Sequence, residues 1–157
     1  MRMSLFTFVA VGLWIGWLWP QDKAPATAQA ATSVGAEQKE VLLEKSGSHF
    51  YADVLVNGEP VRMMVDTGAT LVVIAPEHAE RLGIKFDRAN FEPIARVANG
   101  DVVNGMEVTF DSVAIEGKKV PRVRGAIMEG LDMPLLGQAY LGRLSSVEMA
   151  GDYMRLK

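Results

Sequence analysis

Asp66 is the residue of this sequence best placed to do chemistry. It opens the tripeptide Asp66-Thr67-Gly68, which follows the mostly apolar segment 61–65 and precedes an apolar run at 71–74. A strand that ends at Asp66 would hold the carboxylate at a fixed point, and a carboxylate can accept or donate a proton during catalysis. Gly68 lets the backbone approach closely, and its N–H can orient the carboxylate. The motif therefore indicates a general acid or base, with a structural turn as the alternative, since these residue types also favour turns.

Other kinds of site are poorly represented. The chain has no cysteine, which excludes disulfides and thiolate chemistry. Its two histidines, His49 and His78, are too few for a histidine-rich metal site, and no metal or organic cofactor is expected. Ser48 and His49 could suggest a nucleophile and its base, but neighbours on a strand point to opposite faces. The net charge of -3 is small, which argues against a nucleic-acid partner.

Short strands separated by turns are predicted across residues 40–157. The expected strands follow an opening apolar run at 41–43 and lie at residues 50–56, 61–65, 71–74, 94–98, 106–110, 113–115, 120–127 and 153–156. Asn57-Gly58 predicts a hairpin because both residues tolerate positive φ. Further turns are predicted at Asn99-Gly100, Asn104-Gly105, Glu116-Gly117 and Gly151-Asp152. This pattern indicates an all-β barrel or sandwich.

One short helix is predicted from Pro76 to about Leu82. Proline suits the first position of a helix. Glu77 favours the positive N-terminal end of the helix dipole, and Arg81 favours the negative C-terminal end. Gly83 can adopt the left-handed conformation that ends a helix.

A membrane segment is predicted at residues 1–20. The stretch 4–19 is almost entirely apolar and uncharged, although as a helix it would span roughly 24 Å against a hydrocarbon core of roughly 30 Å. We expect a retained signal anchor, with a signal peptide cleaved near residues 26–30 as the alternative. Arg2 favours a cytoplasmic N-terminus and an exported remainder. Residues 21–39 have the composition of a flexible linker that leads to a folded domain at 40–157.

A wider set of residues gives the motif a family resemblance. The run Val54-Leu55-Val56-Asn57-Gly58 is followed at hairpin spacing by residues 61–70, and Leu135-Leu136-Gly137-Gln138 comes much later. This combination resembles the retropepsins, and most closely the single-domain, membrane-anchored retropepsin-like aspartic proteases of bacteria, over roughly residues 45–157. The resemblance implies a closed β-barrel that forms one half of a homodimeric active site. It also implies a single-pass bacterial inner-membrane protein with a periplasmic domain, or a periplasmic protein if the signal is cleaved.

The resemblance makes Asp66 catalytic, with Thr67 and Gly68 supporting it. Aspartic protease chemistry needs two carboxylates that share one proton, so that one accepts a proton from water while the other acts as the acid. The chain has one such motif, and its nearest imitation, Asp111-Ser112-Val113, lacks the glycine. The second carboxylate must therefore come from another copy across a two-fold axis.

The resemblance also implies where a peptide substrate would lie. Ala69 and Thr70 are expected to contact the substrate, and Thr70 stands where viral members carry an acidic residue. A hairpin flap is expected at residues 96–103, with Asn99-Gly100 at its tip as a further substrate contact. The segment 135–137 is expected to thread behind the catalytic loop.

Two other interpretations remain open. The same fold could hold an extended peptide without cutting it, or be a protease kept silent by dimer dissociation or a closed flap.

Four cations, Lys118, Lys119, Arg122 and Arg124, are interpreted as a solvent-exposed strand or turn, with contact to anionic lipid head groups as the alternative.

Overall fold

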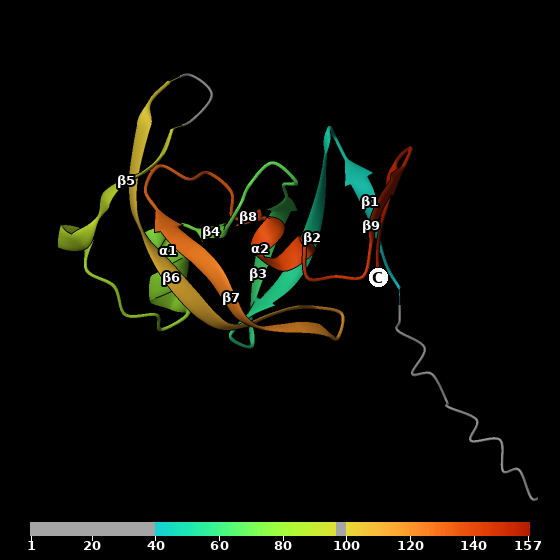
Figure 1. Cartoon of the computed structure of the whole chain (residues 1–157), viewed down its shortest axis with the longest axis horizontal. Helices are drawn as coiled ribbons and strands as arrows, with labels where there is room; N and C mark the ends of the chain where they lie inside the picture. Colours follow the sequence, from blue (N-terminus) through green and yellow to red (C-terminus); the bar gives the residue numbers. More distant parts are fainter. Residues whose placement is uncertain (1–39, 97–99) are drawn as a thin grey trace, which may run out of the picture. The chain divides into compact units, whose positions relative to one another are not determined.

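The computed structural model of this chain describes residues 40–96 and 100–157. Within these ranges the chain is mostly β-strand, as expected, with two short α-helices and one 3-10 turn (Figure 1). The strands are β1 (Val41–Ser46), β2 (His49–Val56), β3 (Glu59–Val65), β4 (Val72–Ile74), β5 (Glu92–Arg96), β6 (Val102–Ile115), β7 (Lys118–Met128), β8 (Leu135–Leu136), β9 (Val147–Ala150) and β10 (Tyr153–Leu156). The helical elements are α1 (Pro76–Arg81), η1 (Arg88–Asn90) and α2 (Gln138–Leu141).

The described strands form one sheet, and the expected closed barrel is wrong. Their order is β5-β6-β7-β4-β8-β3-β2-β1-β10-β9, so β5 and β9 are end strands. One edge of β2 is divided between two partners: its first residues pair with β1, and Leu55 and Val56 pair with β6. The contact with β6 covers only two residue pairs of β2, and the pairing with β1 also covers two. From β1 the sheet continues to β10 and β9.

The hairpin between β2 and β3 forms as predicted. Asn57 and Gly58 both have positive φ, at 52° and 96°, which matches the twist that a two-residue hairpin turn requires. Alternate residues of the two strands are buried in the core, namely Phe50, Ala52, Val54 and Val56 of β2 and Val61, Met63 and Val65 of β3. This alternation fixes the register and brings β3 to its end at Val65, directly before Asp66.

The predicted turn at Asn104-Gly105 is wrong, because both residues lie inside the long strand β6. Gly105 pairs with Met128 of β7. A Cβ at Gly105 would lie 2.7 Å from the Ile94 side chain and would overlap the carbonyl oxygen of Ile127. The glycine therefore serves close approach of the backbone to its neighbours rather than a turn.

The helix α1 begins at Pro76 as predicted and is followed by Gly83 with a φ of 68°. The second helix, α2, was not predicted, since four residues are too short to show a helical pattern. It contributes the fully buried Tyr140, whose hydroxyl donates to the carbonyl oxygen of Lys118 at 2.8 Å. Burial raises the pKa of Tyr140 to about 12, so the phenol keeps its proton and this hydrogen bond at ordinary pH.

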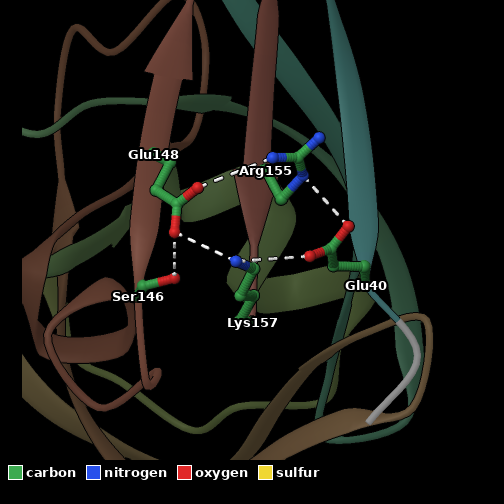
Figure 2. A network of polar contacts seen from close by, with 5 residues as sticks. All are labelled: Glu40, Ser146, Glu148, Arg155 and Lys157. Carbon is green, nitrogen blue, oxygen red and sulfur yellow. Dashed lines mark hydrogen bonds and ion pairs between the residues drawn. The ribbon is translucent and has the colours of Figure 1, made fainter. Parts of the chain in front are cut away.

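Four charged side chains connect β1, β9 and β10 (Figure 2). Arg155 lies 3.0 Å from Glu40 and 3.6 Å from Glu148, while Lys157 lies 3.4 Å from Glu40 and 3.1 Å from Glu148. Ser146 also donates to Glu148, and hydrogen bonding, first from Lys157, lowers the pKa of that carboxyl. These charged side chains are 39% to 48% exposed, so water weakens the attraction and the network adds little stability.

The membrane segment and linker expected at residues 1–39 lie outside the described residues. Among residues 40–96 and 100–157, no helix is both long enough and apolar enough to cross a bilayer.

Candidate active site

The loop that carries Asp66 is fixed at both ends by one short strand. β8 lies between β3 and β4, parallel to β3 and antiparallel to β4 (Figure 1). Leu135 is aligned with Met64 of β3 and with Val73 of β4. The backbone N–H of Asp66 donates to the carbonyl oxygen of Leu136 at 3.1 Å. The segment 135–137 thus threads behind the loop, as predicted.

The Asp66 carboxylate is oriented by the backbone of its own loop. The N–H of Gly68 donates to Oδ1 of Asp66 at 2.9 Å, as predicted. The N–H of Ala69 donates to the Asp66 carbonyl oxygen at 3.2 Å. A Cβ at Gly68 would lie 3.2 Å from the same Oδ1, so any other residue there would crowd the carboxylate. This geometry holds a half-buried carboxylate in one position with part of its surface open.

The residues after β8 support the Asp66 loop through hydrogen bonds to its backbone. The backbone N–H groups of Gln138 and Ala139 donate to the carbonyl oxygens of Ala69 and Thr70, both at 2.8 Å. The Gln138 side chain donates from Nε2 to the carbonyl oxygen of Thr67 at 2.9 Å. Sequence reasoning identified the apolar-apolar-glycine pattern but missed this role of Gln138. The only signal for it was its place directly after Gly137.

Gly137 has to be glycine for the support to reach the loop. A Cβ there would overlap the carbonyl oxygens of Leu71 and Ala69, which belong to the loop backbone. Backbone atoms cannot rotate away as a flexible side chain can. The close contact between the two segments therefore depends on the missing side chain.

The other predicted site residues belong to this loop or fall in the segment between β5 and β6. Thr67, Gly68 and Thr70 are exposed and Ala69 is half-buried. The hairpin expected as a flap forms between β5 and β6, where Arg96 donates to the Gly100 carbonyl oxygen at 2.7 Å. Asn99 lies outside the described residues, and a substrate contact by this hairpin stays a prediction.

The described residues provide one carboxylate at this position. No interaction within the described ranges joins Asp66 to a second carboxylate, and Asp111 of the imitation motif lies in β6. The described residues also contain no group of three acidic or histidine side chains that could hold a metal ion. What this loop offers chemically is a rigidly held carboxylate beside exposed Thr67.

Comparison with known proteins agrees with this geometry. Residues 52–143 match the family described as "gag-polyprotein putative aspartyl protease". The crystal structure of a retropepsin-like aspartic protease from Rickettsia conorii is similar, with a TM-score of 0.62 and 30% sequence identity, covering 75% of this chain and 89% of that one.

Two curated relatives are uncharacterized proteins. A protein in the cobV 5′ region of Sinorhizobium sp is 31% identical over 85% of this chain, and the protein RP867 of Rickettsia prowazekii (strain Madrid E) is 30% identical over 80%. The chain spans 58% and 53% of the length of these relatives. The family match covers more than half of the chain and includes the Asp66 loop and the residues that support it. This chain therefore belongs to the retropepsin-like aspartic protease family.

Proposed function

We propose that the chain is an aspartic endopeptidase that works as a homodimer, with each protomer supplying one Asp66. The observation that carries the proposal is the fixed Asp66 carboxylate, which accepts the Gly68 N–H at 2.9 Å in a loop supported by residues 135–139. Membership of a retropepsin-like family supports the same reaction class.

The reaction would use water and the two Asp66 carboxyl groups, one ionised and one protonated. The ionised carboxylate takes a proton from water as the water oxygen bonds to the carbonyl carbon of the peptide, and the protonated carboxyl gives its proton to the carbonyl oxygen. The carboxyl that took the proton from water then gives it to the amide nitrogen, while the other, now ionised, takes a proton from a hydroxyl of the diol as the carbon–nitrogen bond breaks. The products are a new carboxyl group and a new amine, and no cofactor takes part.

The dimer follows from this need for two coupled carboxyls. Two carboxylates this close cannot both ionise, so their protonation is shared. A single chain brings one Asp-Thr-Gly, and a two-fold axis beside Asp66 would bring the second. Exposed Thr67 would then face its counterpart and hold the two loops together.

The substrate is proposed to be an extended peptide. It would run past Ala69 and Thr70 and be covered by the hairpin tip at Asn99-Gly100. We further propose that residues 1–20 tether the protein to a bacterial inner membrane with the domain in the periplasm, or direct its secretion there if they are cleaved. A tether would raise the local protomer concentration and favour dimers.

The test is peptide-library cleavage by the full chain in mild detergent, from mildly acidic to neutral pH. The Asp66→Asn protein is compared with an Asp53→Asn control, which removes an exposed carboxylate from β2. We expect the wild type and the control to cleave and Asp66→Asn to be inactive. If all three are silent in protein shown to be dimeric, the proposal fails and a peptide-binding role is favoured instead.

A further inference from the structure

A pocket lined by arginines lies beside the loop that carries Asp66. Its volume is about 370 Å³. On one side it is bounded by residues of the loop and its support, and on the other by three arginines from two separate parts of the chain. The residues that matter here are Thr70, Leu71, Gln138, Arg122, Arg124 and Arg143.

The positive charge in this pocket is only partly neutralised. Arg124 pairs with Glu107 at 3.0 Å. Arg143 donates to the carbonyl oxygens of Pro121 and Arg122, at 2.5 and 3.3 Å, and these neutral groups hold its guanidinium without cancelling its charge. The walls themselves contain no acidic residue. Two guanidinium charges are therefore left to attract an anion.

Arg122 has an unusual backbone for its position. It lies inside β7 with a φ of 49°, a conformation that costs free energy for a residue other than glycine. The register of β6 and β7 skips Arg122 and Asp111, which fall between the aligned pairs Phe110–Val123 and Ser112–Pro121. None of the ion pairs among the described residues includes Arg122. Its charge is presented to the pocket and remains available.

The pocket lies within reach of a peptide bound at Asp66. Thr70 and Leu71 follow Asp66 by four and five residues, and Gln138 bonds the loop at Thr67. Four residues of chain span at most about 14 Å, and an extended peptide advances about 3.3 Å per residue. A substrate side chain about three or four residues from the scissile bond could therefore enter the pocket.

We propose that this pocket is a substrate subsite for a carboxylate side chain. The enzyme would then prefer peptides with Asp or Glu about three or four residues from the scissile bond. The guanidinium fork matches the two oxygens of a carboxylate, which suits this ligand better than a single positive point charge would. This inference rests on the proposed peptidase function and names the class of substrate for it.

The first experiment compares pairs of peptides that differ only by Glu or Gln at each position around the cleavage site. In wild-type protein we expect kcat/KM to be about two- to fivefold higher for Glu at the subsite position, the range typical of solvent-exposed charge pairs. Arg122→Asn removes one of the two uncancelled charges and keeps a residue that tolerates positive φ, so it should lower the ratio toward one, with Arg143 left to attract the carboxylate. Lys119→Gln, which removes a cation of β7 outside the pocket walls, should leave the ratio as in wild type. An unchanged ratio in Arg122→Asn overturns the proposal.

The second experiment separates failure of the subsite from failure of the enzyme. The same labelled peptides are titrated onto Asp66→Asn protein with and without Arg122→Asn, and fluorescence anisotropy reports binding without turnover. If nothing is cleaved by wild type but the preference for Glu in binding depends on Arg122, the subsite stands and the peptidase proposal fails. Equal binding of the Glu and Gln peptides overturns the subsite.

The membrane alternative is tested by co-sedimentation with phosphatidylglycerol vesicles. The subsite predicts that Arg122→Asn and Lys119→Gln affect vesicle binding equally. A loss of vesicle binding specific to Arg122→Asn, with the peptide preference intact, would assign this charge to lipid and overturn the proposal.

Discussion

Replacing Gly137 by alanine should separate the support of the Asp66 loop from the loop itself. The new Cβ would overlap the carbonyl oxygens of Leu71 and Ala69, so one of the two segments has to move. That movement breaks the two 2.8 Å hydrogen bonds from Gln138 and Ala139 to the loop. Each lost bond costs about 1 kcal/mol, and overpacking of a tight contact adds about 1–3 kcal/mol. We therefore expect the free energy of unfolding to fall by about 3–5 kcal/mol, a large part of the stability of a small domain.

The assay is urea unfolding followed by circular dichroism, with Gly130→Ala as the matched control. Gly130 has a left-handed backbone, with a φ of 65°, but a Cβ there meets nothing within 4 Å. The control should lose only about 1–2 kcal/mol, the cost of a left-handed conformation. If Gly137→Ala is no less stable than Gly130→Ala, the close contact does not hold the loop and the reasoning is wrong.

Three further predictions follow from single contacts. Gln138→Leu removes the bond to the Thr67 carbonyl oxygen; kcat on a neutral peptide should fall about tenfold through a loosened loop, and an unchanged kcat would contradict this. Within residues 40–96 and 100–157, the buried Nδ1 of His78 has no hydrogen-bond partner, and burial is the main cause that lowers the pKa of His78 below 6.5. As the pH falls below about 6.5, the unfolded state binds more protons at His78 than the folded state does. The contribution of neutral His78 to the free energy of unfolding is therefore fully present above about pH 6.5. It is lost as the pH falls through the pKa of His78 in the folded state. His78→Gln should therefore lose less Tm between about pH 7.5 and pH 5 than wild type, and an equal loss would exclude this role. Pairing with Glu148 raises the pKa of Lys157, and pairing with Lys157 lowers the pKa of Glu148. A double-mutant cycle of this exposed pair should find a small coupling that disappears in about 1 M salt, and a coupling that persists there would contradict an exposed pair.

Local chemistry explains the parts of the fold that were predicted correctly. Asn57-Gly58 turns the chain because its two residues accept positive φ, and Gly68 orients Asp66 from two residues away. Both effects act over a few bonds, so the sequence alone carries them. The Leu135-Leu136-Gly137 segment was placed correctly through its resemblance to a known family rather than through any local rule.

Tertiary contacts explain the failures. Asn104-Gly105 has the same chemistry as the true hairpin turn, but Gly105 is required by the backbone of Ile127. Arg122 and Arg143 are 21 residues apart and meet only because α2 lies against β7. The spacing of residues along the sequence does not predict this contact. The open ends of the sheet likewise depend on how β1 and β6 share the edge of β2, which follows from packing and not from strand propensity.

The most direct test of the central claim is to mix wild-type and Asp66→Asn protomers and measure peptidase activity against the wild-type fraction. Exchange between the two is verified with two affinity tags. If each active site needs Asp66 from both protomers, mixed dimers are inactive and activity falls as the square of the wild-type fraction, to about a quarter at equal amounts. A fall in direct proportion, to about half at equal amounts, would mean that each protomer works independently with its own Asp66, and about three quarters would mean that one Asp66 per dimer is sufficient; either result would contradict the account.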